Sequence, residues 1–211
     1  MPRDAARGNR AFFRLGGFWV GPLRLGMSVF EKAVDDAVAS LGQIRQLEPA
    51  LLQASDLVRS CLVGGHKLLV CGNGGSAADG ADFATEYTCR FIRDRKAYPA
   101  INLAACGSLL TAVGNDYGYE QSFARQVEAF GKPGDVLVAI STSGNSPNIV
   151  LALTRAREAG LHTIALLGKD GGKAKGLADV DLIVSSRVTA RVQEGHKFLL
   201  HSICEQVEGA L

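Results

Sequence analysis

Apolar residues downstream of residue 27 follow a helical spacing at first. They recur every three or four positions over 28–46, which predicts an amphipathic helix there. A second helix is expected over 49–63, because proline suits its first turn and the Gly-Gly pair after residue 63 suits its end. The apolar positions of the first helix are Phe30, Val34, Ala37, Val38 and Leu41.

Beyond residue 66 the pattern changes to short, continuous apolar runs separated by longer stretches of helical spacing. Such runs are typical of strands that are buried on both faces of a parallel sheet. Strands are expected at 67–71, 99–104, 135–140, 162–167 and 180–184. Helices are expected at 76–92, 107–129 with a break near 115–118, 147–159, 172–178 and 189–208. The alternation predicts an α/β fold: a doubly wound, five-stranded parallel sheet flanked by helices, in three layers, with N-terminal helices before it.

Residues 1–26 differ from the rest of the chain because they carry five arginines against one acid, Asp4. Arg14 and Arg24 interrupt the apolar stretch that a secretory signal peptide requires. We interpret 1–26 as a basic N-terminal extension, either disordered or upstream of a natural start at Met27, with a transit peptide as the alternative. No repeat or linker interrupts the sequence of 27–211, so we expect a single domain there.

Composition narrows the class of protein. Lysine and arginine total 23 against 21 acids, a net charge of +2, which lacks the basic excess of nucleic-acid binders. No apolar run approaches the roughly 20 residues of a membrane span. The five cysteines are odd in number, show no CxxC spacing and lie mostly in apolar segments. We therefore expect reduced thiols, a cytoplasmic location, and neither a nucleic-acid nor a membrane partner.

A glycine-rich segment, CGNGGS at 71–76, lies between an expected strand and an expected helix. Glycines let a ligand approach the backbone, and a helix N-terminus offers N–H groups to an anion. The segment lacks the lysine of a Walker A loop. It loosely fits a dinucleotide fingerprint, but the next expected strand ends without the acid that would bind a ribose. A phosphate-binding loop is favoured over a nicotinamide site and over a plain tight turn.

Hydroxyl groups are concentrated at 141–146, directly after the expected strand 135–140. With the helix that begins at Pro147, they could form a phosphate cradle that needs no lysine. A serine-rich turn with a helix cap is the alternative. Because both loops follow strands of one parallel sheet, we expect them at the same edge. The hydroxyls belong to Ser141, Thr142, Ser143 and Ser146.

A third polar segment, GNDYG, interrupts the expected helix 107–129. Its Asn115 and Asp116 can form hydrogen bonds with sugar hydroxyls, but both are also ordinary turn residues. By itself this segment is weak evidence for a sugar site.

Five segments together resemble the sugar isomerase (SIS) family, and in particular its phosphoheptose isomerase branch. They are CGNGGSAADGADFATE, GNDYG, GDVLVAISTSGNSPN, GKDGG and ARVQEGHKFLLH. The resemblance extends from about residue 28 to the C-terminus. It implies an aldose–ketose isomerase that converts sedoheptulose 7-phosphate to D-glycero-D-manno-heptose 7-phosphate. It also implies a homotetramer with active sites at subunit interfaces.

An aldose–ketose isomerisation needs a base for the carbon-bound proton and an acid for the carbonyl oxygen. The resemblance implies that Glu86 is the base and that His201, on the last helix, is the acid. The phosphate would meet Ser76, Ser141, Thr142, Ser143 and Ser146. The sugar and the loop around it would involve Asn73, Gly74, Gly75, Asn115, Asp116 and Gln193.

Many members of this family also bind a divalent metal, often zinc. They do so through a histidine four residues before the glutamate, that glutamate, a glutamine and the catalytic histidine. The matching residues here are Asp82, Glu86, Gln193 and His201, so an aspartate stands in the position of the histidine. A carboxylate is a harder ligand than imidazole, so the site should prefer zinc less than the sites of its histidine-bearing relatives do. No nucleotide cofactor is expected.

Other functions remain open within the same fold. One non-catalytic relative binds the bacterial replication initiator, but that branch lacks the glutamate and the last-helix histidine that this chain has as Glu86 and His201. A sugar-phosphate-sensing regulator usually adds a DNA-binding domain, for which 1–26 is too short. An isomerase of another sugar phosphate would use the same residues.

Overall fold

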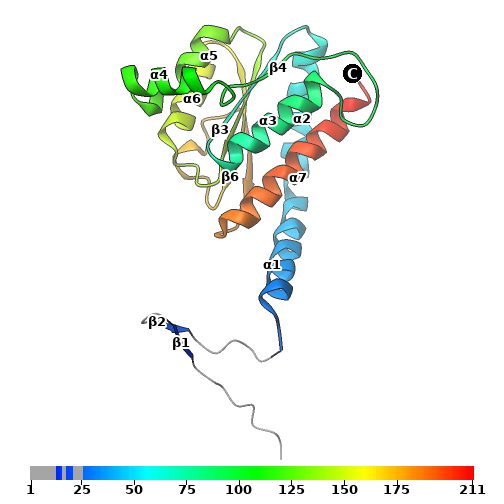
Figure 1. Ribbon diagram of the computed structural model, residues 1–211. Helices are drawn as coiled ribbons and strands as arrows, with labels where there is room; N and C mark the ends of the chain where they lie inside the picture. Colours follow the sequence, from blue (N-terminus) through cyan, green and yellow to red (C-terminus); the bar gives the residue numbers. More distant parts are fainter. Residues whose placement is uncertain (1–12, 16–17, 21–25) are drawn as a thin grey trace, which may run out of the picture. The chain divides into compact units, whose positions relative to one another are not determined.

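The structure is a computed structural model that describes residues 13–15, 18–20 and 26–211. Its backbone contacts divide the chain into two units, Met1–Val38 and Ala39–Leu211. In the first unit, strands β1 (Phe13–Leu15) and β2 (Phe18–Val20) form an antiparallel pair (Figure 1). The rest of the predicted extension 1–26, apart from Gly26, lies outside the described residues.

The second unit is built around a parallel five-stranded sheet with the strand order β4-β3-β5-β6-β7. Every residue of β3 and β5 is buried, as the continuous apolar runs predicted. The predicted doubly wound α/β fold is therefore confirmed. The strands are β3 (Leu68–Gly72), β4 (Ala100–Asn102), β5 (Val136–Ser141), β6 (His162–Gly168) and β7 (Val180–Val184).

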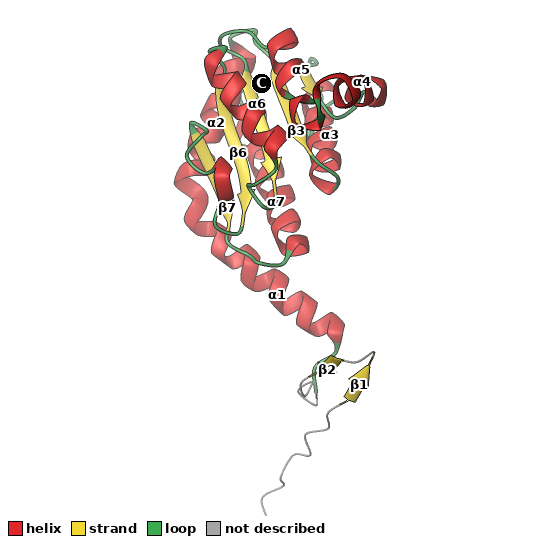
Figure 2. Cartoon of the chain, turned by 90° about the vertical axis from the view of Figure 1, so that its left-hand side faces the viewer, coloured by secondary structure: helices red, strands yellow, loops and turns green. Residues whose placement is uncertain are grey.

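Helices cover both faces of the sheet, which lies between them in Figure 2. Side chains of α2, α3 and α7 pack on one face, and those of α5 and α6 pack on the other. None of the described helices is long and apolar enough to cross a bilayer. The helices are α1 (Val29–Ile44), α2 (Glu48–Val63), α3 (Gly75–Thr88), α4 (Gly107–Tyr117), α5 (Ala124–Phe130), α6 (Pro147–Glu158) and α7 (Thr189–Glu208), with short 3-10 turns η1 (Arg45–Leu47), η2 (Tyr119–Gln121) and η3 (Gly172–Ala174).

Two predicted helices are shorter than expected. Helix α3 ends at Thr88, four residues before position 92, because Cys89 leaves the helical conformation. The Arg95 guanidinium then donates hydrogen bonds to the carbonyls of Glu86 and Tyr87 in the last turn. The helix predicted at 172–178 is only η3, since glycines with positive φ precede and follow it. The predicted break near 115–118 is confirmed between α4 and η2.

The strand order has a topological switch between β3 and β5. From β3 the chain moves outward through α3 to β4 and then crosses back to β5 on the other side of β3. The helices that follow these two strands therefore lie on opposite faces of the sheet. In doubly wound sheets a crevice opens at the carboxyl ends of such a strand pair, and ligands bind there. Both loops singled out in the sequence, 72–76 and 141–146, start at this edge.

The turn at Gly144 gives a test of this loop packing. Gly144 has φ of +64°, and a Cβ there would overlap the Gly171 carbonyl and lie 3.0 Å from the Gly172 nitrogen. Gly65 also has positive φ, +80°, but has no atom within 4 Å of a Cβ position. Gly65→Ala should cost about 1–2 kcal/mol from the backbone alone. Gly144→Ala should cost roughly 1–3 kcal/mol more, from overpacking, as measured by urea denaturation. Equal losses for Gly144→Ala and Gly65→Ala would show that the loop at Gly144 can move away from Gly171 and Gly172 without cost.

Candidate active site

The loop after β3 turns sharply into α3. Gly74 has φ of +57°, a conformation that favours glycine. A Cβ on Gly72 would lie 2.5 Å from the Ser76 carbonyl oxygen. No side chain caps the start of α3, and Ser76 in its first turn is buried. Glycine is therefore required at positions 72 and 74 by the turn itself, and the predicted approach of a ligand to this backbone stays a prediction.

The loop after β5 is a compact turn of ordered hydroxyls. Ser141 Oγ accepts a hydrogen bond from the Gly144 N–H at 3.1 Å and donates to Ser146 Oγ at 3.4 Å. Ser143 Oγ accepts one from the Asn145 N–H at 3.1 Å. Helix α6 begins directly afterwards, without a side-chain cap. Hydroxyls and the positive end of a helix dipole thus lie together at the carboxyl end of β5.

A pair of amides joins the two loops. Asn73 and Asn148 exchange two hydrogen bonds, each 2.9 Å long, and Asn148 is buried. The Tyr119 hydroxyl also donates to Asn73 Oδ1, at 2.9 Å. The sequence analysis named Asn73 but missed Asn148 and Tyr119. Their partners are far away in the chain, so no local pattern reveals the pairing.

A cavity of about 580 Å³ opens beside this amide pair. Its size falls within the range of small-molecule sites. Asn115 and Asp116 are not among the residues that line it; they are exposed near the end of α4, hydrogen-bonded to each other at 2.8 Å. The cavity is lined by Asn73, Tyr119, Glu120, Ser146, Pro147 and Asn148.

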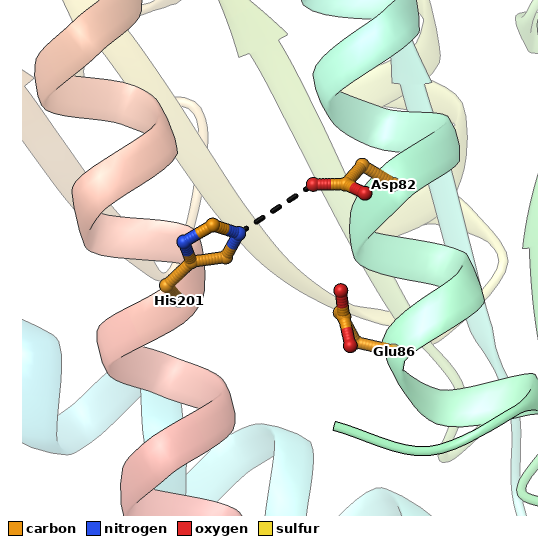
Figure 3. Close-up of side chains that lie close together, drawn as sticks. All are labelled: Asp82, Glu86 and His201. Carbon is orange, nitrogen blue, oxygen red and sulfur yellow. Dashed lines mark hydrogen bonds and ion pairs between the residues drawn. The ribbon is translucent and has the colours of Figure 1, made fainter. Parts of the chain in front are cut away.

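A second cluster lies between α3 and α7. Asp82 and Glu86 extend from α3 toward His201 of α7 (Figure 3). Their potential ligand atoms all lie within 4.8 Å of one another, and His201 Nε2 is 3.5 Å from Asp82 Oδ2. Burial raises the pKa of Glu86, and the negative charge of Asp82 raises it further. A glutamate of raised basicity next to an imidazole is an arrangement suited to acid–base chemistry.

A lysine that the sequence analysis did not name completes this cluster. The ammonium of Lys197 lies 2.7 Å from Asp82 Oδ2 and 3.0 Å from Asp79 Oδ1. Its hydrogen bond to Asp82 lowers the pKa of that carboxyl. The available signal was the spacing: Asp79 and Asp82 are three residues apart on α3, and Lys197 and His201 are four apart on α7.

Gln193 lies away from this cluster. A Cβ on Gly75 would overlap its side-chain amide, which therefore packs against the loop after β3. Helices α3 and α7 run in the same direction, with Gln193 beside the start of α3 and His201 beside Asp82. Since a helix rises about 1.5 Å per residue, Gln193 is roughly 12 Å along the axis from His201.

The metal site that the family resemblance implies needs Asp82, Glu86, Gln193 and His201 around one ion. Asp82, Glu86 and His201 are close enough to share a divalent ion. Gln193 lies at the other end of the helix pair, and the Asp82 oxygen nearest His201 already binds the Lys197 ammonium. Within one chain the arrangement therefore does not bring four protein ligands to one zinc ion.

The two parts of the site are separated along α3. Ser76 is in the first turn of this helix and Glu86 is in its last turn. Ten residues of helix correspond to about 15 Å. Ser76, expected to meet phosphate, and Glu86, expected to act as the base, are therefore well apart along α3 within one chain.

Comparison with known proteins identifies the family. The SIS domain profile matches residues 34–168, so the chain belongs to the SIS domain family. It is 55% identical to the phosphoheptose isomerase of Citrifermentans bemidjiense over 166 residues, which cover 79% of this chain and 86% of that protein. The phosphoheptose isomerase of Clostridium acetobutylicum is 52% identical over 169 residues, 80% of this chain and 83% of that one. These similarities place the chain in the phosphoheptose isomerase branch.

Solved structures agree with the sequence relatives. The phosphoheptose isomerase of Francisella tularensis superposes with a TM-score of 0.82 at 35% identity, covering 87% of this chain and all of that one. That of Neisseria gonorrhoeae gives 0.79 at 40% identity, covering 86% of this chain and all of that one. The fold and the branch are thus supported by both kinds of comparison.

Replacing Asn148 tests whether the amide pair joins the two loops. Asn148→Ala leaves the half-buried Asn73 amide and the buried Ser122 hydroxyl without this partner, which should cost about 1–3 kcal/mol of unfolding free energy. Tyr119→Phe removes one hydrogen bond to the same Asn73 at an exposed position, and should cost roughly 0.5–1.5 kcal/mol. Thermal and urea denaturation measure both. A loss for Asn148→Ala no larger than that for Tyr119→Phe would contradict the assignment.

Proposed function

We propose that this protein is an aldose–ketose isomerase that converts sedoheptulose 7-phosphate to D-glycero-D-manno-heptose 7-phosphate. The observation that carries the proposal is the convergence of Glu86 and His201, from α3 and α7, within one cluster. The chain's place in the phosphoheptose isomerase branch supports the substrate. The glycine-rich turn after β3 and the hydroxyls that precede α6 support it as well, because such groups at helix starts suit a phosphate.

In the proposed reaction Glu86 removes the proton from carbon 1 of the ketose and delivers it to carbon 2. His201 donates a proton to the carbonyl oxygen on carbon 2, which gives a 1,2-enediol. When Glu86 returns its proton to carbon 2, His201 takes the proton of the carbon 1 hydroxyl, so the aldose forms and both side chains regain their starting states. Burial and the charge of Asp82 raise the pKa of Glu86, which makes its carboxylate a stronger base. Asp82, 3.5 Å from His201 Nε2, orients the imidazole. No step requires the metal.

The other end of the substrate is assigned to the sheet edge. We propose that the phosphate is bound by Ser76 and by the hydroxyls of 141–146, with the start of α6 behind them. Asn73, Gly74 and Gly75 would shape the loop around the sugar, and Asn115 and Asp116 would contact its hydroxyls. Because Gln193 packs on Gly75, we assign it to substrate binding. The hydroxyls of the second loop are Ser141, Thr142, Ser143 and Ser146.

We also propose a homotetramer whose active sites lie between subunits. Apolar side chains of α1 are exposed in the single chain, including Phe30 at 75% and Val38 at 64%. With bonds near 1.5 Å, the seven bonds from carbon 2 to phosphorus span at most roughly 10 Å. The two parts of α3 are further apart than that along its axis. A second copy could therefore supply one half of each site.

A cytoplasmic location is proposed from the cysteines. All those in the described part of the chain are unpaired, and three are buried. Burial raises the pKa of Cys61 and of Cys204 to about 12, which keeps both as unreactive thiols.

Replacing the base gives the direct test of the reaction. Glu86→Gln preserves the shape of the side chain and removes its basicity, so turnover of sedoheptulose 7-phosphate should fall by at least ~100-fold with the stability nearly unchanged. Glu205→Gln, at an exposed position on α7, is the matched control and should retain activity. Aldose formation is followed for sedoheptulose 7-phosphate and fructose 6-phosphate in parallel. Undiminished turnover in Glu86→Gln would remove this residue from the mechanism. Faster turnover of fructose 6-phosphate than of sedoheptulose 7-phosphate would contradict the proposed substrate.

Mixing two inactive variants tests the shared site. Ser143→Asp places an anion in the proposed phosphate cradle and should abolish substrate binding, while Glu86→Gln lacks the base. If the two halves of a site come from different copies, subunit exchange between the variants should restore about a quarter of the sites. The readout is activity after refolding the two proteins together, with each refolded alone as the control. Activity that never returns would place both halves in one chain.

A further inference from the structure

Lys197 has a position that the acid–base chemistry described above does not explain. Its ammonium lies between two carboxylates of α3, 3.0 Å from Asp79 Oδ1 and 2.7 Å from Asp82 Oδ2. The same Asp82 oxygen is 3.5 Å from His201 Nε2. Asp79 is largely buried, with 13% of its side chain exposed, whereas Asp82 and Lys197 are partly open to solvent.

The ammonium supplies the positive charge that this cluster needs. Asp79, Asp82 and Glu86 place three carboxyl groups on successive turns of one side of α3, and Lys197 contacts two of them directly. Like charges at these spacings on a helix repel one another, and an intervening cation removes that repulsion. The lysine also holds the Asp82 carboxylate in place. It donates a hydrogen bond to Oδ2, the same oxygen that faces His201.

We propose that Lys197 is the resident cation of the acid–base cluster. It positions Asp82 against His201, and it opposes the binding of a divalent metal by Asp82, Glu86 and His201. Lys197 is thus a positioning residue, since it acts through Asp82. This role in positioning rests on the proposed isomerase function, whereas the effect on metal binding does not depend on it.

The geometry explains why the lysine and a metal exclude each other. A metal bound by the Asp82 carboxylate would lie about 2.0–2.2 Å from its oxygen. The Lys197 ammonium is bound to Oδ2, the same oxygen that faces His201. Two cations on one carboxylate repel strongly at the effective dielectric of a partly buried site. Binding of the metal therefore requires the ammonium to leave Asp82.

The test measures metal binding directly. Zn²⁺ and Co²⁺ are titrated into the metal-free full-length protein by calorimetry, and the cobalt absorption bands report the coordination. Lys197→Met keeps the length of the side chain and removes its charge, so it should bind both metals at least tenfold more tightly than the unmodified protein. Lys197→Arg keeps the charge and should remain as weak as the unmodified protein. Lys132→Met, at an exposed lysine near the amino end of β5, is the control for lost surface charge and should also bind weakly.

Kinetics provide the readout for positioning. In the presence of a chelator, Lys197→Met should lose at least about tenfold in kcat with little change in KM, because Asp82 is no longer held against His201. Lys197→Arg should recover most of that loss, and the unmodified protein should be insensitive to the chelator. Equal metal affinity in Lys197→Met and the unmodified protein would overturn the proposal. Melting temperatures measured beforehand, with Lys197→Gln as a second uncharged variant, separate these results from misfolding.

The two proposals fail in different ways. If the protein does not isomerise the heptose phosphate, Lys197→Met still reports the competition with metal. If it isomerises the substrate but the affinity for metal does not change, the proposed function stands and the role of Lys197 is wrong.

Discussion

The packing of α3 beside α7 is the contact on which the site depends. Both helices run in the same direction on one face of the sheet. Residues near the start of one helix therefore contact residues near the start of the other, and the same holds further along. Gly75 leaves room for the Gln193 side chain of α7, because a Cβ at this position would overlap its amide. Further along, Asp82 meets His201. A change in the register of one helix by a single turn would separate all of these pairs.

The cluster between these helices combines groups that are unfavourable in isolation. Partial burial raises the pKa of Glu86, and its neighbour Asp82 adds to the effect. Lys197 offsets part of the negative charge and lowers the pKa of Asp82. The pKa values of the two acids are therefore shifted in opposite directions, although the acids are only one helical turn apart. Separated pKa values of this kind are common where one carboxyl takes up a proton and another stays charged.

The sheet edge depends on a different kind of constraint. The strand order puts β3 next to β5 in the centre of the sheet, so the loops that follow them open at one place. Glycines at 72 and 144 allow those loops to pack against neighbouring backbone, and the Asn73–Asn148 pair connects them. The two loops are thus held in place by backbone packing and short polar side chains, and the cavity beside them is also lined by Tyr119, Glu120 and Pro147.

The sequence by itself determined the sheet, the loops that follow β3 and β5, and the order of the helices. Its signals for these features are local: continuous apolar runs such as 135–140, glycines at sharp turns, and proline at a helix start. The resemblance to a family then singled out Glu86 and His201, which the structure places in one cluster. The sequence predicted the ends of the helices less accurately. Helix α3 ends at Thr88 instead of position 92, where Arg95, a residue beyond the helix, binds the carbonyls of its last turn.

Only the tertiary structure decided which distant side chains meet. Lys197 is an ordinary helical lysine in the sequence, and it becomes part of the site because Asp79 and Asp82 face it from another helix. Asn148 joins Asn73 across 75 positions of the chain, and Gln193 packs on Gly75 away from the cluster predicted for it. Spacing along one helix fixes which residues share a face. The register between two helices is set by how their side chains pack, and no single segment contains that information.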